Sequence, residues 1–411
     1  MFAVVRSNRR LRRLFLAQTV SRAGDAFNTV ALVILVFQLT GSGIRVAATV
    51  AFEILPILLL GPIAGMAADR FPRRRIMVVA DLVRAALAAT IALTHTSTAV
   101  AYGVAFGLSA GALLFNPAAS SIVPELVDNE DDLVTANSAL WTAAVASQVV
   151  LAPLAGGLIA TVGVGWAFGV NAASYLVSAA LLWGLDAGTT PADLSRGGWR
   201  RVSAGLDAVR RHPLLRRLMV VQALAALSAG ATGGLLVVLA GERLGVDAGG
   251  FGLLLGAIGA GAVLGPTVWR RSIRPGDRRW LFGPFAVRGA VDLLLAVTVS
   301  PVLAGVSLLV YGMSTSTGMV AYQSTLQSEV PAELRGRAFA LYDAVWNGAR
   351  LLSLGAGGLL ADSVGIRAVY VLGGLLLVAA AVVGVAPNPS WKRGSMLGVS
   401  GYGYKRRESR P

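Results

Sequence analysis

Nine ionisable side chains lie inside the long apolar stretches of this 411-residue sequence, where charge is least expected. At the centre of a lipid-exposed helix, each would cost roughly 2.5 to 3.5 kcal/mol. They must therefore face protein or a water-accessible cavity, where carboxylates can exchange protons and charged groups can pair. The nine side chains are Arg22, Asp25, Glu53, Asp81, Arg84, Arg288, Asp292, Asp343 and Arg350.

Helical spacing suggests partners for most of these charges. Residues three or four apart lie on one helix face and can form ion pairs. Asp343 and Arg350 share a face but are two turns apart, about 10.5 Å, so we expect each to pair with another helix. The expected pairs are Arg22–Asp25, Asp81–Arg84 and Arg288–Asp292, of which the last two are interpreted as structural or gating elements.

Five acids against four bases leave one carboxylate without a partner. Glu53 has no base within a helical turn, and an unpaired carboxylate in a low-dielectric site can take up a proton near neutral pH. Glu53 is therefore the first candidate for proton coupling. Asp25 is the second, because it lies about 11 residues, roughly 16 Å, into the first apolar stretch, near the middle of a bilayer. Alternatively, both acids are structural and hold helices together by hydrogen bonds.

The apolar stretches themselves predict membrane-spanning helices. Hydrophobic residues make up 55% of the chain, against roughly 45 to 50% in soluble proteins. The runs are continuous over about 20 residues, which favours helices over the alternating pattern of barrel strands. We therefore expect an all-α integral membrane protein with twelve transmembrane helices. The expected spans are 14–38, 44–68, 75–94, 98–122, 136–160, 165–186, 214–240, 249–268, 280–299, 301–326, 338–362 and 365–387.

The basic residues predict the orientation of these spans, because cytoplasmic loops are enriched in arginine and lysine. With the N-terminus inside, the outer loops carry Arg45, Arg243 and Arg367, while the cytoplasmic segments carry 29 of the 36 basic residues. Both termini are therefore expected in the cytoplasm. The net charge of +15 is then a topological label spread along one membrane face, and it does not indicate nucleic-acid binding.

Short matches at nearly one offset indicate an internal duplication. They occupy the same places in two six-span units, which single chance matches would not do. The resulting layout is two pseudo-symmetric six-helix bundles with a cavity between them, as expected for alternating access. The matches are AGGL at 155–158 and 356–359, Val-Pro at 123–124 and 330–331, and Gly-Pro at 61–62 and 265–266.

The division of the chain follows from this duplication. In the loop between the halves, Trp199, Val202, Leu206 and Val209 are spaced 3, 4 and 3 apart among arginines, which predicts an amphipathic helix on the cytoplasmic membrane surface. A solvated linker is the alternative. A tail rich in glycine, serine and basic residues predicts disorder. The expected units are an N-terminal bundle over 1–186, a linker over 187–213, a C-terminal bundle over 214–387 and a cytoplasmic tail over 388–411.

A charged motif between the second and third spans carries a family resemblance. The stretch GMAADRFPRRR contains Gly65, Asp69, Arg70, Arg73 and Arg74, and it resembles the loop signature of the major facilitator superfamily. A proline, at position 72, replaces the usual glycine of the turn. The resemblance implies that this cluster is a gating latch, centred on Asp69, that joins the two bundles when the cavity faces outward. Alternatively, the arginines only mark topology.

Other stretches resemble one branch of that superfamily, the bacterial exporters similar to enterobactin exporters and macrolide-efflux proteins. They include VSRAGDAFNTVALVILVFQLTGSG, NPAASSIVPELV and VPAELRGRAFALYD. In the fifth span, APLAGG with Pro153, Gly156 and Gly157 is similar to the antiporter signature of the superfamily, with alanine in place of its first glycine.

The resemblance and the buried charges together predict a secondary active transporter of the bacterial cytoplasmic membrane. We expect a monomer that exports a small, amphipathic molecule, such as a drug, siderophore or secondary metabolite, by proton-coupled alternating access. Nothing in the sequence calls for a cofactor or a metal. An uptake transporter or uncoupled facilitator of the same fold is the alternative. A membrane enzyme or scaffold is disfavoured, because His95 and His212 have no metal-ligand spacing around them.

Overall fold

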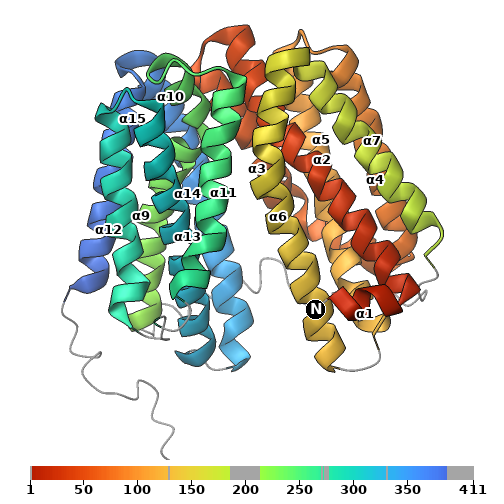
Figure 1. Cartoon of the computed structure of the whole chain (residues 1–411). Coiled ribbons are helices and arrows are strands. Elements are labelled where there is room, and N and C mark those ends of the chain that lie inside the picture. Colours follow the sequence, from red (N-terminus) through yellow and green to blue (C-terminus); the bar gives the residue numbers. More distant parts are fainter. Residues whose placement is uncertain are drawn as a thin grey trace, which may run out of the picture.

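The chain folds into long helices that run roughly parallel to one another (Figure 1). The computed structural model describes residues 2–127, 130–185, 213–269, 272, 277–329 and 332–386, with backbone alone for 2–4, 61–70 and 213–214 and for parts of 130–149 and 323–340. The predicted linker helix and tail lie outside these ranges. The helices are α1 Phe2–Ser7, α2 Arg9–Thr40, α3 Gly43–Arg70, α4 Arg73–Leu93, α5 Thr98–Ile122, α6 Glu130–Val162, α7 Val164–Trp183, α9 Pro213–Gly234, α10 Leu236–Glu242, α11 Ala248–Trp269, α12 Arg278–Val297, α13 Pro301–Glu329, α14 Ala332–Val364 and α15 Ile366–Val385, with a 3₁₀ turn at Val123–Glu125.

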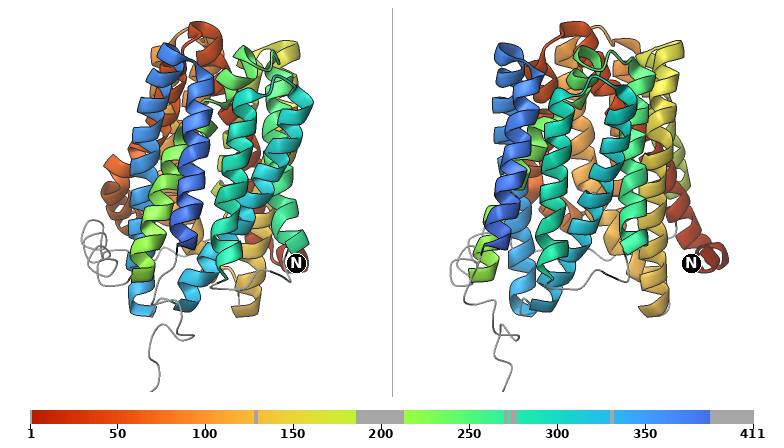
Figure 2. Two further views of the ribbon diagram at one scale, coloured as in Figure 1. Left: turned by 90° about the vertical axis from the view of Figure 1, so that its left-hand side faces the viewer. Right: turned by 60° about the vertical axis from the view of Figure 1, so that its left-hand side comes forward.

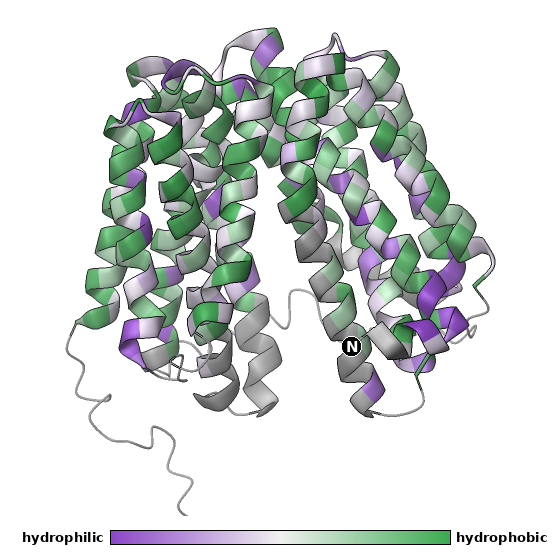
Figure 3. Cartoon of the chain, viewed as in Figure 1, coloured by the Kyte–Doolittle hydropathy of each residue, from purple (hydrophilic) through white to green (hydrophobic). Residues whose placement is uncertain are grey.

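The all-α membrane fold predicted from the apolar stretches is confirmed. Among the described residues, nine helices are long and apolar enough to cross a membrane, and ten are if α9 and α10, bent by 46° to each other, form one span. The full count of twelve stays a prediction. Large apolar side chains such as Leu93, Val302 and Trp183 are more than two-thirds exposed, and hydrophobic residues cover much of the outward helix surface (Figure 3). A bilayer would cover such a surface.

Four glycines with left-handed backbone mark corresponding turns of the two halves. Gly41 and Gly245, 204 residues apart, have φ values of 59° and 60° after α2 and α10. Gly163 and Gly365, 202 residues apart, have φ values of 89° and 104° before α7 and α15. Residues with a Cβ atom rarely adopt this region, so glycine permits each tight turn. The matched offsets are those of the duplication inferred from the sequence.

The helix contacts repeat between the two halves. In the first half, α2 packs against α6 and α7, α4 against α5 and α7, and α3 against α5. In the second half, α9 packs against α14 and α15, α12 against α13 and α15, and α11 against α13. Each of these contacts in the first half therefore has its counterpart in the second, and the halves lie side by side (Figures 1 and 2).

Two helix crossings join the halves, α3 with α14 and α6 with α11. We call the end of the molecule that carries Gly41 and Gly163 the distal end, and the opposite end, where α2 starts, the basal end. The halves meet toward the distal end and diverge toward the basal end (Figure 1). Small residues allow the close approach: a Cβ atom at Gly156 of α6 would lie 2.9 Å from Cα of Gly252 of α11, and one at Gly358 of α14 would lie 2.7 Å from Cα of Ile44 of α3.

Candidate functional site

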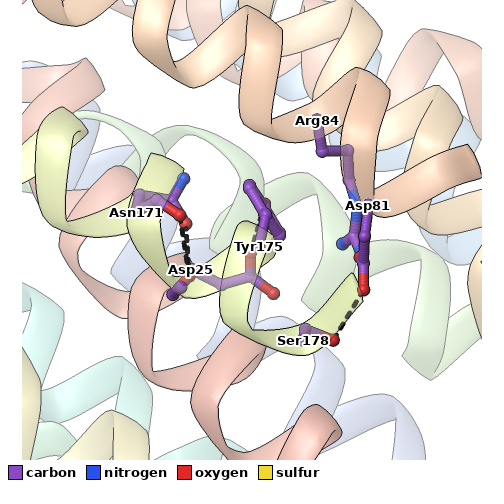
Figure 4. A network of polar contacts seen from close by, with 7 residues as sticks. Asp25, Asp81, Arg84, Asn171, Tyr175 and Ser178 are labelled. Atoms are coloured by element: carbon purple, nitrogen blue, oxygen red, sulfur yellow. Dashed lines mark hydrogen bonds and ion pairs between the residues drawn. The ribbon is translucent and has the colours of Figure 1, made fainter. Parts of the chain in front are cut away.

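A buried polar network crosses three helices of the first half (Figure 4). Asp81 and Arg84 of α4 form an ion pair, and the Ser178 hydroxyl of α7 donates to the second Asp81 oxygen at 2.6 Å. The Tyr175 hydroxyl of α7 donates to Asp25 of α2 at 2.5 Å. Asp81 is fully buried and Arg84 is 3% exposed, so each charge depends on its partner for stabilisation. The ion pair predicted from i,i+3 spacing is present.

Aromatic rings hold the Arg84 guanidinium in place. Its central carbon lies 4.3 Å from the centroid of the Tyr175 ring and 4.9 Å from that of Phe115. Cations over aromatic faces are stabilised, and more strongly when desolvated. Tyr175 therefore links two acids of the network, because its ring contacts the Arg84 that pairs with Asp81 and its hydroxyl binds Asp25.

The second half has a corresponding network around Arg288 and Asp292 of α12. Arg288 donates to the Tyr311 hydroxyl of α13 at 2.9 Å and lies 4.8 Å from that ring. Asp292 accepts from the Ser228 hydroxyl of α9 at 3.3 Å. Arg84 and Arg288, which are 204 residues apart, thus both lie over a tyrosine in their own half.

Two of the expected ion pairs are absent. Arg288 and Asp292 attract each other at longer range, but each forms its hydrogen bond with a hydroxyl on a neighbouring helix. The prediction failed because it considered only the spacing within one helix and not the partners on other helices. Arg22 is exposed, and Asp25 accepts from Tyr175 instead.

Three of the charged groups interact across the space between the halves. Glu53 of α3 is attracted by Arg350 of α14 and repelled by Asp25 of α2. Both Glu53 and Asp25 are partly exposed rather than sealed in the core. The base that attracts Glu53 therefore belongs to the other half, although the two side chains form no ion pair in the part of the chain that the structure describes.

The predicted latch is described in part. Gly65, Asp69 and Arg70 lie in the last turns of α3, whose side chains are outside the described residues. Arg73 pairs with Glu125 of the same half and donates to the Ser121 carbonyl at 3.1 Å. Glu125 thus supplies the counter-charge that Arg73, only 7% exposed, requires.

Arg74 and the antiporter-like motif have different surroundings. Arg74 donates to the Leu185 carbonyl at 3.4 Å. In α6, Gly156 lies against α11 at the crossing between the halves, while the space beside Gly157 is open. Pro153, in the same helix, is half-buried. Gly156 is therefore the residue of the motif that permits close helix packing.

Asp362, near the end of α14, was missed by the sequence analysis. Its carboxylate accepts from the Ser42 hydroxyl at 2.6 Å and from the backbone N–H groups of Gly43 and Ile44 at 2.5 and 3.3 Å. It thus caps the start of α3 from the other half of the molecule, at the distal end. The sequence contained one signal of this contact. A carboxylate in the last turn of a helix is unfavourable beside the negative end of the helix dipole, so its favourable partner is expected on another element.

Comparison with known proteins decides the family. Residues 2–396 match the family model described as a transmembrane secretion effector of the MFS, the major facilitator superfamily. The chain belongs to the major facilitator superfamily. Its members are membrane transporters rather than enzymes, so the predicted family and the predicted absence of enzyme activity are confirmed.

Relatives within the superfamily include efflux proteins. The chain is 27% identical over 393 residues to the MFS-type transporter YfiS of Bacillus subtilis, covering 91% of this chain and 92% of the relative. It is 21% identical over 404 residues to macrolide efflux protein A of Streptococcus pyogenes, covering 90% and 94%. It is 32% identical over 158 residues to the multidrug efflux pump Tap of Mycobacterium tuberculosis, covering 36% and 38%.

Solved structures share the fold. A bacterial homologue of the iron transporter ferroportin in an inward-facing state has a TM-score of 0.73 at 19% identity, covering 93% of this chain and 98% of that one. A mutant of the nucleoside transporter NupG has a TM-score of 0.75 at 13% identity, covering 91% and 98%. The protein is therefore a multi-span transporter with the major facilitator fold, of a kind that binds small molecules within a membrane.

Proposed function

We propose that the protein exports a small, amphipathic molecule from the bacterial cytoplasm by proton-coupled alternating access, acting as a monomer. The observation that carries the proposal is Glu53, a partly exposed carboxylate within α3 that forms no ion pair with a described residue and is attracted over a longer range by Arg350 of the other half. Protonation of Glu53 removes its attraction to Arg350. The loss of this attraction destabilises the state in which the distal end is closed. It therefore favours the state in which the distal end is open and the basal end is closed.

The closed distal end supports alternating access. The Asp362 cap and the glycine crossings join the halves at that end. The abundant arginines of the basal loops favour a cytoplasmic location for that end, so the described conformation faces inward in this proposal. When the distal end opens, the basal ends approach, and the cluster around Gly65, Asp69, Arg70, Arg73 and Arg74 is then the latch that the family resemblance implies.

Proton coupling supplies enough free energy for export. One proton moved through 100 mV provides about 2.3 kcal/mol, which supports a concentration ratio of roughly 50-fold. Efflux proteins among the relatives, one of them described as a macrolide efflux protein, favour export over uptake. The superfamily also contains uptake transporters and facilitators, so direction is part of the test.

Replacing Glu53 by glutamine should abolish concentrative efflux, because the amide keeps the shape of the carboxylate and cannot carry the proton. Efflux of a radiolabelled macrolide from a pump-deficient bacterial host is the measurement, with and without a protonophore. We expect wild-type efflux to collapse with the protonophore, Glu53→Gln to fall at least 10-fold, and Asp25→Asn to fall by less. Asp277→Asn is the matched control: Asp277 caps α12, and asparagine caps equally well. Full efflux by Glu53→Gln would remove Glu53 as the carrier.

A further inference from the structure

An unpaired carboxylate lies near two aromatic rings that contact each other at a tilt in the second half. Asp343 of α14 is exposed and forms no ion pair with a described residue; its backbone carbonyl accepts from Asn347 at 2.9 Å. The rings of Tyr322 of α13 and the adjacent Tyr342 of α14 are 4.9 Å apart between centroids, at 38°. Asp343 follows Tyr342 directly in α14, so its carboxylate and the two rings lie in one region of the second half.

The position of Asp343 directs its carboxylate toward the space between the halves. It lies seven residues before Arg350, on the same face of α14, and Arg350 interacts with Glu53 of the other half. Asp343 is about 10.5 Å nearer the basal end than Arg350, where the halves diverge (Figure 1). An unpaired carboxylate within a spanning helix is too costly to face lipid, so this position in an aqueous opening is the favourable one.

A second observation points to a ligand. Tyr322 is only 7% exposed. Its hydroxyl is buried and has no hydrogen-bond partner among the described residues. Buried polar atoms are normally paired, and an orphan in a native structure needs an explanation. A bound molecule beside Asp343 could supply that partner.

From these features, we propose that Asp343, Tyr342 and Tyr322 form a binding site for an organic cation with an apolar or aromatic body. The carboxylate supplies the counter-charge, and the tyrosine rings supply cation–π and apolar contact. The inference deepens the proposed function and rests on it, because binding at this site is the first step of export only in a protein that exports. Neither Arg350 nor Arg288 forms an ion pair with Asp343 in the described part of the chain: Arg350 is attracted by Glu53, and Arg288 donates to the Tyr311 hydroxyl.

Two probes of nearly equal size and opposite charge test the site directly. Binding of radiolabelled tetraphenylphosphonium to the purified full-length protein in detergent is measured by equilibrium dialysis, with protein-free micelles as background and with tetraphenylborate as competitor. We expect saturable binding of the cation and no competition by the anion. Asp343→Asn should weaken the Kd at least 10-fold, Tyr342→Leu should weaken it about 3- to 10-fold, and Asp343→Glu should keep most of the affinity. Asp277→Asn is again the control, and size-exclusion chromatography checks that each variant is folded.

The outcomes separate this site from the proposed export. Absence of cation binding, equal affinity in folded Asp343→Asn, or competition by the borate would overturn the cation site, even in a protein that exports another compound. Binding that depends on Asp343 in a protein with no proton-dependent efflux would keep the site and contradict the proposed function. The dialysis uses no membrane gradient, so failure of coupling cannot imitate failure of binding.

Discussion

Replacing Asp81 by asparagine should destabilise the protein by about 3 to 5 kcal/mol, the range for leaving one partner of a buried ion pair without its counter-charge. The variant leaves Arg84, which is 3% exposed, among Tyr175, Phe115 and a neutral amide. The Ser178 hydroxyl can still bond the amide oxygen, but it supplies no charge. The measurement is the unfolding free energy of the purified protein in mixed micelles with increasing sodium dodecyl sulfate.

Two controls make the Asp81 result specific to the loss of the counter-charge. The double variant Asp81→Leu, Arg84→Met removes both charges and should recover most of the stability, because apolar replacements of a buried pair are often neutral. Asp343→Asn changes an exposed carboxylate on a spanning helix and should stay within about 0.5 kcal/mol of wild type. Equal stability of Asp81→Asn and Asp343→Asn would show that the network contributes no such stabilisation.

Leucine at Gly156 should force the halves apart at the distal end. A Cβ atom there would lie 2.9 Å from Cα of Gly252 and would also meet the Ala248 carbonyl, and this backbone cannot move aside as a flexible side chain could. Overpacking typically costs about 1 to 3 kcal/mol. In this protein the overpacking acts between two halves that can separate, so we expect the distal end to open in most molecules.

Spin labels can detect this opening, and the chain contains no cysteine that would have to be removed first. Labels at Thr161 and Glu242, exposed near the distal ends of α6 and α10, should report a longer distance in Gly156→Leu. Gly157→Leu is a matched control one residue away, where no heavy atom lies within 4 Å of the added Cβ, and its distance should equal that of wild type. An unchanged distance in folded Gly156→Leu would contradict the role of this crossing.

Local patterns in the sequence predicted the features that depend on one helix. The apolar runs placed the helices to within a few residues at many ends, for example 98–122 for α5. The Asp81–Arg84 pair was predictable because both partners lie on one face of α4. The glycines at the turns follow from the duplication, since a left-handed residue needs glycine at both copies of a turn.

Features that depend on two helices could not be derived in this way. Arg288 and Asp292 have the spacing of a pair, yet hydroxyls on α13 and α9 compete for them. Glu53 is attracted by Arg350, almost 300 positions later in the sequence. Helix spacing fixes which face a residue occupies, whereas partners on other helices depend on packing angles and rotations that no pattern within one helix encodes.

The central claim is that the distal and basal ends open reciprocally, and paired distance measurements on Asp362→Ala test it most directly. Loss of a helix N-cap costs about 0.5 to 2 kcal/mol, which would shift the equilibrium between distal-closed and distal-open states roughly 2- to 30-fold. Ser363→Ala is the control, because the Ser363 hydroxyl donates only within its own helix, to Leu359.

Electron–electron double resonance is measured between labels at Arg45 and Arg367 for the distal end, and between labels at Arg75 and Arg279 for the basal end. All four positions are exposed. Alternating access predicts that Asp362→Ala increases the population with a long distal distance and increases the population with a short basal distance by the same fraction. A distal change with an unaltered basal distribution would contradict the account.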